Sequence, residues 1–407
     1  MEKLFEVELT HPYEEGNEAC AVLSLPAMPY ELRDALDKVR ITDGGNMIME
    51  ITETAPSVRY LSDHMEEGTC KVPAVYLLNA LAEKIAGMSF VERCAFEGLV
   101  RVEFEKEIER IPAAQLYDYA FSTDCCHVVP EVDDYAALGK FYVDNDFLPE
   151  FRNVPEKALA YLDYTKIGKE QCMWEGGVML PGGGYVTQHT ELAEAAKDFV
   201  PQEPDYTVLL EIRHGEKTRL LKMPSTVRES ASALEAVGAS DWPDVAIRCV
   251  DCKIPALTDA ITKAEDPDRA NQAAQMLEKL SDRDAVIYKA LLEAAGVPDL
   301  EQALQMMDGL DQYLLTREYA SPADVGRSHL LNLLGGCEAE YMLPHVNLYG
   351  FGESMIQRFH YSMTPYGAIE RRDGEPIREV FDRQADAGRE AGNHQSKPQR
   401  KHREPSR

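Results

Sequence analysis

A short pattern that occurs twice constrains the fold of this 407-residue chain more than any other feature. It lies in an acidic stretch, 131–186, which holds ten carboxylates and five Lys or Arg residues and ends in glycine-rich sequence. Gly139-Lys140 matches Gly326-Arg327 at a spacing of 187. Six further positions match at a spacing of 184: Leu159, Ile167, Gly168, Met179, Pro181 and Gly183 recur as Leu343, Phe351, Gly352, Met363, Pro365 and Gly367. We interpret this as a diverged internal repeat with three residues deleted from the second copy.

The elements expected from hydrophobic periodicity also follow the same order in both halves. In the first half, strands are expected over 5–9, 21–25 and 47–52, a helix from Pro29, and further helices from 72, 90 and 111. In the second half, strands are expected over 206–212, 219–223 and 245–249, and helices over 226–237, 275–292 and 300–307. The shared order supports a duplication of a whole unit.

The chain is too long for one ordinary hydrophobic core, so several domains are expected. We predict an α+β fold, an elongated chain of small α/β and helical modules in two tandem copies. The predicted parts are an N-terminal α/β module of copy 1 (1–70), helical and acidic modules of copy 1 (71–190), a linker (191–206), a diverged copy 2 (207–370) and a disordered basic tail (371–407).

The formal net charge of −29 is the unusual quantity in the composition. Residues 1–190 carry −18, residues 191–370 carry −14 and residues 371–407 carry +3. Charge of this size argues against direct binding of nucleic acid by the folded part and favours a basic protein surface as partner. The alternative is an ordinary acidic protein whose carboxylates are simply solvated.

The sequence indicates a cytoplasmic protein that does not enter a membrane. It contains no apolar run long enough to cross a bilayer, and the opening MEKLFEVEL is acidic and alternating, unlike a signal peptide. The nine cysteines form no secreted-type framework, so we expect reduced thiols.

None of the motifs that usually indicate chemistry is complete, so we expect no enzyme, cofactor or metal. Cys249 and Cys252 form a CxxC without a second pair of ligands, and Ile254-Pro255 follows where a redox motif would start a helix. The glycines at 182–184 precede Tyr185-Val186 rather than the Lys-Ser/Thr of a phosphate loop, which favours a hairpin turn. His127 has no partner spacing typical of a catalytic or metal site.

Rows of carboxylates remain the best candidates for function. Residues three or four apart on a helix have Cβ atoms about 5–6 Å apart, and B-DNA carries about one phosphate charge per 1.7 Å of axis. Acidic rows can therefore imitate a phosphate row. The candidates are Asp133, Asp134, Asp144, Asp146 and Glu150, and the alternating Glu103, Glu105, Glu107 and Glu109. The glutamates would line one face of a strand or wrap round a helix, and both readings stay open. The alternative for all of them is a solvated face.

The runs ALGKFYVDNDFLPEF, VPEKALAYLDYTKIGKE, GGVM and GGYV, together with LLNALAEKIAGM, resemble the ArdA-type antirestriction proteins of conjugative elements. The resemblance covers about residues 1–190 and is clearest over 72–186. It implies an acidic B-DNA mimic, typically dimeric and without catalytic residues or cofactor, that occupies the DNA-binding cleft of type I restriction-modification enzymes and protects incoming mobile DNA. It adds Asp163 to the expected acidic surface.

Two features depart from the family pattern. The usual family member is about half this length, whereas here a second copy follows in which Asp163 becomes Asn347 and residues 321–370 hold only five acids. The basic tail is also unexpected for a DNA mimic. We therefore keep two alternatives: an acidic inhibitor of another DNA-binding defence or nucleoid protein, and an enzyme with an unrecognised carboxylate site. The assembly is expected to be a pseudo-dimer within one chain or a homodimer.

Overall fold

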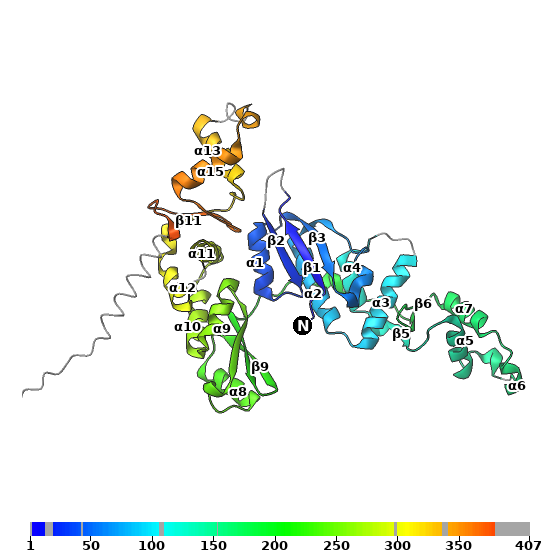
Figure 1. Ribbon diagram of the computed structural model, residues 1–407. Helices are drawn as coiled ribbons and strands as arrows, with labels where there is room; N and C mark the ends of the chain where they lie inside the picture. The colour runs from blue at the N-terminus through cyan, green and yellow to red at the C-terminus, as the bar shows by residue number, and fades with distance from the viewer. Residues whose placement is uncertain are drawn as a thin grey trace, which may run out of the picture. The chain divides into compact units, whose positions relative to one another are not determined.

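The computed structural model describes residues 2–12, 19–41, 44–105, 110–152, 154–296, 299–335 and 341–378. These residues include both helices and antiparallel strands, the latter in several small sheets, which confirms the α+β class (Figure 1). The chain forms two compact units. Unit 1 comprises Met1–Leu9, Val22–Ala27 and Thr42–Gln202, and unit 2 comprises Thr10–Ala21, Met28–Ile41 and Glu203–Arg407. The break after Gln202 falls inside the segment expected to be a linker.

Unit 1 begins with a four-stranded sheet of order β2-β1-β3-β4. The strands are β1 (Phe5–Thr10), β2 (Cys20–Leu25), β3 (Asn46–Thr54) and β4 (Gly68–Lys71). Side chains alternate between buried and more exposed along β1 and β2, as expected for strands with one face on a core. A cis peptide bond joins Leu25 and Pro26 after β2.

Three helices follow in unit 1: α2 (Val72–Ala86), α3 (Phe90–Glu105) and α4 (Ala113–Ala120). Leu78, Leu81 and Ala82 of α2 are fully buried, because a spacing of three or four residues places them on one helix face. Asn79 of α2 connects this helix to the strand module. Its side-chain Oδ1 accepts a hydrogen bond from the Ala27 amide at 2.6 Å, and its Nδ2 donates to the Ala27 carbonyl at 3.2 Å.

The last part of unit 1 contains three helices and a three-stranded antiparallel sheet of order β5-β7-β6. Its elements are β5 (Cys126–Val129), α5 (Tyr135–Asp144), α6 (Glu156–Leu159), α7 (Tyr164–Glu175), β6 (Val178–Met179) and β7 (Tyr185–Gln188). Helices α5 and α7 cross at Gly139 and Gly168, where a Cβ added to either glycine would lie 2.0 or 1.9 Å from a backbone oxygen of the other helix. We call this part the α5/α7 module.

Unit 2 starts with a three-stranded sheet of order β10-β8-β9. It contains β8 (Val208–His214), β9 (Lys217–Met223), α8 (Val227–Val237) and β10 (Ala246–Cys252). Four helices follow: α9 (Thr258–Ala264), α10 (Pro267–Glu278), α11 (Asp282–Ala295) and α12 (Leu300–Met306). Helix α1 (Pro29–Val39) also belongs to unit 2, although it lies early in the sequence.

Unit 2 ends with a second module of two helices and a sheet of order β11-β13-β12. Its elements are β11 (Tyr313–Thr316), α13 (Pro322–Leu334), α15 (Leu348–Phe359), β12 (Ser362–Thr364) and β13 (Gly367–Arg371). Helices α13 and α15 cross at Gly326 and Gly352, where an added Cβ would lie 2.2 or 1.6 Å from a backbone oxygen. The two helix pairs appear in green and orange in Figure 1. We call this part the α13/α15 module.

The internal repeat expected from the sequence is present in the structure. The strand orders β2-β1-β3 and β9-β8-β10 are equivalent, as are β5-β7-β6 and β11-β13-β12. Each copy has a cis proline after its second strand, Pro26 and Pro224. The bonds of Asn79 to Ala27 also recur, because Asn271 of α10 accepts from the Ser225 amide at 2.8 Å and donates to its carbonyl at 3.2 Å.

One repeat position expected from the sequence is wrong by one residue. Val128 of β5 pairs with Val186, and Leu315 of β11 pairs with Ile369, so the last strands match at a spacing of 183. Gly367 is therefore the counterpart of Gly184, and both have a positive φ, +131° and +116°. The first copy has one extra residue in the turn before its last strand. That turn is a hairpin, as predicted, in which the Leu180 amide donates to the Gly184 carbonyl at 2.8 Å.

The predicted start of the disordered tail at 371 is too early. Arg371 ends β13 and forms an ion pair with Asp373 at 2.6 Å. Ile377 is 1% exposed within the hydrophobic core of unit 2, and Arg378 Nε donates to the Ala294 carbonyl at 3.0 Å. Residues 371–378 therefore belong to the fold, because Ile377 supplies apolar surface that the core buries. The rest of the predicted tail lies outside the described residues.

Candidate interaction surface

Six of the predicted acidic residues lie together in sequence within the α5/α7 module, and the structure exposes all of them. They are Asp133, Asp134, Asp144, Asp146, Glu150 and Asp163. Five come from α5 and the segments that flank it, and Asp163 precedes α7. The module therefore presents a set of accessible carboxylates, as the sequence predicts.

Two of these carboxylates hold helix ends. Asp134 is the N-cap of α5 and accepts a hydrogen bond from the Ala137 amide at 2.7 Å. Asp163 is the N-cap of α7 and accepts from the Lys166 amide at 3.0 Å. An aspartate at this position satisfies an amide that the helix leaves without a partner and interacts favourably with the helix dipole. These two residues thus have a structural role as well as an exposed charge.

The other four have different local environments. Asp144 forms an ion pair with Lys140 one helical turn away. Asp146 adopts a left-handed backbone conformation with φ of 60° at the end of α5, and Glu150 lies in the first turn of a short 3-10 helix, Pro149–Phe151. A Cβ added to Gly183 would lie 2.7 Å from Asp133 Oδ1, so this carboxylate lies against the β6–β7 hairpin.

The second group of predicted residues does not form the expected acidic row. Glu103 lies in α3 and is only 7% exposed, so its assignment to an accessible surface is corrected. It belongs to a helix face that packs inward, where the pKa of Tyr119 is raised by burial and by a hydrogen bond with Glu103. Glu105 is the last residue of α3, and Glu107 and Glu109 lie outside the described residues. Where it is described, this segment is a helix.

The acidic set is specific to the first copy. At the repeat spacing of 187, Asp144 and Asp146 correspond to Leu331 and Leu333, and Leu333 is 69% exposed. The N-caps Asp134 and Asp163 correspond to Ser321 and Asn347, which cap α13 and α15 through their neutral oxygens. The repeat therefore preserves the capping function and loses the charge.

Sequence reasoning missed a half-buried carboxylate between the helices and the sheet of the α5/α7 module. Glu175 Oε2 accepts hydrogen bonds from the hydroxyls of Tyr142 at 2.5 Å and Tyr185 at 2.9 Å. Burial, and then Glu175, raise the pKa of both phenols. Glu175 is thus a scaffold residue, and no regular spacing relates the three residues in sequence.

Sequence reasoning also missed exposed apolar side chains in the α5/α7 module. Tyr161 is 90% exposed, Met173 84% and Trp174 81%. Large exposed aromatic residues are enriched at protein interfaces. Acidic and aromatic groups therefore occur on the surface of the same module.

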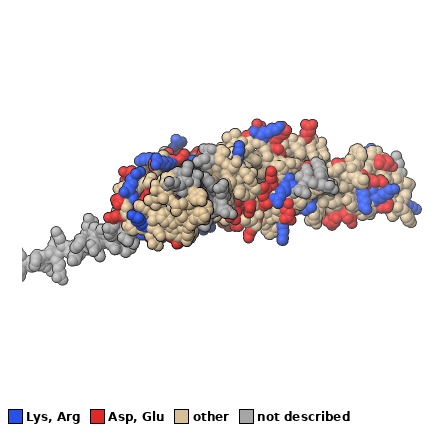
Figure 2. Space-filling view, turned by 90° about the horizontal axis from the view of Figure 1, so that it is seen from above, with Lys and Arg blue, Asp and Glu red and all other residues tan. Residues whose placement is uncertain are grey.

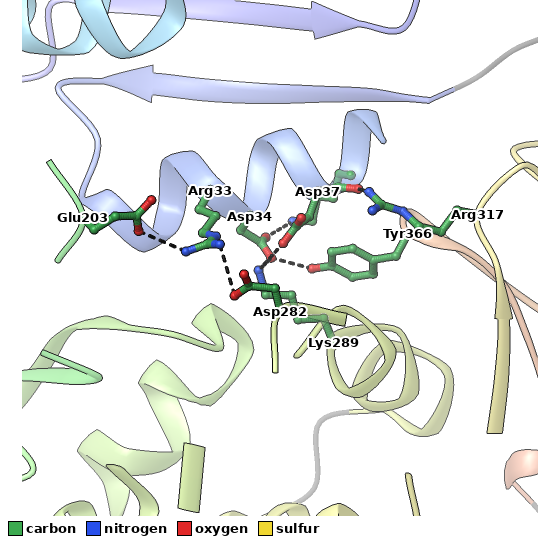
Figure 3. Close-up of polar contacts among 9 residues, drawn as sticks. Arg33, Asp34, Asp37, Glu203, Asp282, Lys289, Arg317 and Tyr366 are labelled. Carbon is green, nitrogen blue, oxygen red and sulfur yellow. Dashed lines mark hydrogen bonds and ion pairs between the residues drawn. The ribbon is translucent and has the colours of Figure 1, made fainter. Parts of the chain in front are cut away.

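A second polar cluster, which no motif indicated, joins α1 to the other elements of unit 2 (Figure 3). Lys289 of α11 is 4% exposed and contacts Asp34 and Asp37 of α1, each at 2.9 Å. Tyr366 donates its hydroxyl to Asp34 at 2.8 Å. Burial acts to raise the pKa of Asp34, but Lys289 and Lys38 outweigh it and hold the pKa below its usual value.

At the edge of the same cluster, Arg33 bridges two further carboxylates. Its guanidinium contacts Glu203 and Asp282, each at 3.1 Å (Figure 3). The Asp37 carbonyl accepts from Arg317 Nη2 at 3.0 Å. The two ion pairs of Arg33 are exposed, with 77% of the Glu203 side chain and 78% of the Asp282 side chain accessible, so they contribute little to stability. Asp34 and Lys289, in contrast, are both buried, and each has an oppositely charged partner. We call Asp34, Asp37, Lys289 and Tyr366 the α1–α11 cluster.

The cysteine pair and the histidine considered as chemical motifs lie in environments that do not favour reactivity or metal binding. Cys249 and Cys252 are buried in β10, where burial raises the pKa of the Cys249 thiol to about 12 and disfavours a reactive thiolate. His127 stacks on His189 with ring centroids 4.1 Å apart. Within the described residues, no group of three or more His, Cys, Asp or Glu side chains is arranged to hold a metal ion.

On the face drawn in Figure 2, basic and acidic side chains are intermixed. Among the described residues, no helix has the length and apolar character needed to span a membrane. No protein-family model matches the chain, and a search of curated proteins finds no similar sequence.

Proposed function

We propose that this chain is a non-enzymatic antirestriction protein that acts as a mimic of B-DNA. The observation that carries the proposal is the set of six exposed carboxylates on the α5/α7 module of a chain with net charge −29. The sequence resemblance of this region to ArdA-type proteins supplies the class of target. The target would be the DNA-binding cleft of a type I restriction-modification enzyme in the cytoplasm of a cell that receives mobile DNA.

The charge is large enough for this role. Residues 1–370 carry −32, which at the density of B-DNA equals the charge of about 54 Å of duplex, or about 16 base pairs. A basic cleft that binds phosphates would gain similar electrostatic energy from exposed carboxylates. The same charge repels DNA, so the protein would compete with DNA for the cleft and would not bind DNA.

The six carboxylates differ in whether they also stabilise the fold. Asp134 and Asp163 hold helix ends, so their replacement would alter the module as well as its charge. Asp144, Asp146 and Glu150 make no hydrogen bond with a main-chain amide among the described residues, and can be neutralised with less structural effect. These three are the residues with which the proposal is best tested.

The test is an assay of DNA cleavage and methylation by a purified type I enzyme at low salt. The triple variant Asp144→Asn, Asp146→Asn, Glu150→Gln should inhibit at least tenfold less than the natural chain. Asparagine also tolerates the left-handed conformation at position 146. The matched control neutralises three exposed acids of unit 2, by Glu216→Gln, Glu235→Gln and Asp244→Asn, and should inhibit nearly as well as the natural chain.

The outcomes separate the proposal from its alternatives. Equal loss in both triple variants would show that total charge matters and this surface does not. No inhibition by the natural chain at any concentration would rule out the type I target. Affinity capture from the host with the natural chain, compared with the α5/α7 triple variant, would then identify a different DNA-binding partner.

A further inference from the structure

A cavity of about 350 Å³ lies beside the α1–α11 cluster, and its lining is basic although the chain as a whole is strongly acidic. The charged residues that line it are Arg33, Asp37, Lys253, Asp282, Arg283, Lys289 and Arg317. Five are cations and two are carboxylates, and all belong to unit 2. The size is within the range of small-molecule sites.

The two carboxylates are already engaged by two of the cations. Asp37 contacts Lys289 at 2.9 Å, and Asp282 contacts Arg33 at 3.1 Å (Figure 3). The remaining cations, Lys253, Arg283 and Arg317, form no ion pair with any carboxylate of the described residues. The residues that line the cavity therefore include three more cations than carboxylates, and Asp34 and Glu203, which contact Lys289 and Arg33 from outside the lining, offset part of this charge.

Some hydrogen-bond donors of these three cations have no acceptor within the described part of the chain. Lys253 Nζ donates to the Leu280 carbonyl at 2.7 Å, and Arg317 Nη2 donates to the Asp37 carbonyl at 3.0 Å. Arg317 Nε is buried and has no hydrogen-bond partner within the described part of the chain. Arg283 forms neither a hydrogen bond nor an ion pair there. The guanidinium donors of Arg283 are exposed and unused within the described part of the chain, so this part of the cavity wall can gain from an added acceptor.

Two further features favour an anion. Asp282, Arg283 and Ala285 place the first turn of α11, a 14-residue helix, in the cavity wall, and a helix N-terminus carries partial positive charge. Burial lowers the pKa of Lys253, and Arg33 and Lys289 lower it further, while Asp282 and Glu278 act in the opposite direction. A bound anion would supply the missing negative charge.

We propose that this cavity binds a small phosphate-bearing anion through Lys253, Arg283 and Arg317. Guanidinium groups provide paired donors for phosphate oxygens, and the ammonium group adds a point charge. Ala285, Val286 and Leu315 form an apolar part of the wall that accommodates the body of an organic phosphate. The site shares no residue with the acidic surface of the α5/α7 module, so each proposal can be tested independently of the other.

Isothermal titration calorimetry on the full chain tests this site, with inorganic phosphate, pyrophosphate and ADP as probes at constant ionic strength. Adenosine serves as the probe without phosphate. We expect saturable binding of one phosphate-bearing molecule per chain and no binding of adenosine. Equal affinity for pyrophosphate and ADP would assign binding to the phosphates alone, whereas tighter binding of ADP would add a contribution from the apolar wall. Both results support the site.

The key variant is Arg283→Gln, because Arg283 is exposed and its replacement removes no internal contact. It should weaken phosphate binding at least fivefold, and Lys253→Gln should have a similar effect. Arg228→Gln is the matched control, since Arg228 is exposed on α8 and does not line the cavity. Absence of saturable binding, or an equal loss in Arg283→Gln and Arg228→Gln, would overturn the proposal.

Discussion

Asp34 is a residue whose role appears only in three dimensions. On α1 it is a charged residue in a helix rich in acids and bases, with no sequence feature that predicts burial. In the structure it is buried and accepts contacts from Lys289, Lys38 and Tyr366. Because Lys289 is also buried, removal of one charge leaves the other less well compensated.

We predict that Asp34→Asn lowers the free energy of unfolding of unit 2 by about 2–3 kcal/mol. The loss is smaller than for an isolated buried pair, since Lys289 keeps Asp37 at 2.9 Å. Urea unfolding measures the change. Asp144→Asn, at an exposed ion pair, is the control and should leave stability unchanged. A loss of equal size in both variants would contradict a special role for the buried cluster.

The lowered pKa of Asp34 also predicts a pH dependence. A carboxyl group whose pKa is lower in the folded state stabilises the fold above its unfolded pKa, here 3.8, and loses that effect as the pH falls through the folded value. The difference in unfolding free energy between the natural chain and Asp34→Asn should therefore be constant from pH 7 to 5 and shrink below about pH 4. A difference that grows on acidification would have the wrong sign.

At the scale of elements, the glycines are the part of the repeat that the sequence identified best. Gly139, Gly168, Gly326 and Gly352 let two helix pairs cross with their backbones in contact. Backbone contact tolerates no side chain, so these positions keep their identity while neighbouring positions change. The fixed spacing of 184 pairs Gly367 with Gly183, whereas its structural counterpart is Gly184. The two copies differ by one residue in this hairpin, and a fixed spacing cannot reveal such a difference.

We predict that Gly168→Ala and Gly352→Ala each destabilise their own module by about 1–3 kcal/mol or more. The added methyl group would lie 1.9 or 1.6 Å from a backbone oxygen, so the helices must separate. Hydrogen exchange of amides in α5 and α7, or in α13 and α15, measures the local effect. Gly182→Ala is the control, because no atom outside Gly182 and its two chain neighbours lies within 4 Å of the added Cβ. Unchanged exchange in both glycine variants would contradict the close crossing.

The asparagine contacts are a second element-scale feature, which sequence reasoning did not find. Asn79 and Asn271 each satisfy both backbone groups of a residue near a cis proline. We predict that Asn79→Ala and Asn271→Ala each cost about 1–3 kcal/mol, since the strand residue loses two hydrogen bonds. Thermal unfolding provides the measurement. Asn332→Ala, at an exposed position of α13, is the control and should have little effect. An equal loss of stability in all three variants would contradict a stabilising role for the asparagine hydrogen bonds.

At the scale of the whole molecule, the α+β class and the duplication could be predicted, because periodicity and spacing report local elements and their order. The membership of α1 in unit 2 could not, because it depends on contacts of Lys289 and Tyr366 with residues hundreds of positions away. The prediction of accessible carboxylates holds for the six aspartates and glutamates of the α5/α7 module and fails for Glu103. Charge alone does not reveal which face of a helix packs inward.

The tandem repeat leads to a prediction for the number of chains in the protein particle in solution. If two copies in one chain replace a dimer of single-copy chains, the protein should have the mass of one 45.6 kDa chain. Light scattering coupled to size-exclusion chromatography at micromolar concentration measures this. A stable particle of two chains would contradict the pseudo-dimer and favour a homodimer of tandem chains.

The central claim is that the chain competes with DNA for a basic cleft. A fluorescent DNA duplex bound to a type I restriction-modification enzyme should be displaced by the purified chain at 50 mM salt. Because the attraction is electrostatic, the affinity of the chain should fall at least tenfold between 50 and 200 mM salt. A duplex that stays bound at 50 mM salt in the presence of excess chain would contradict the claim.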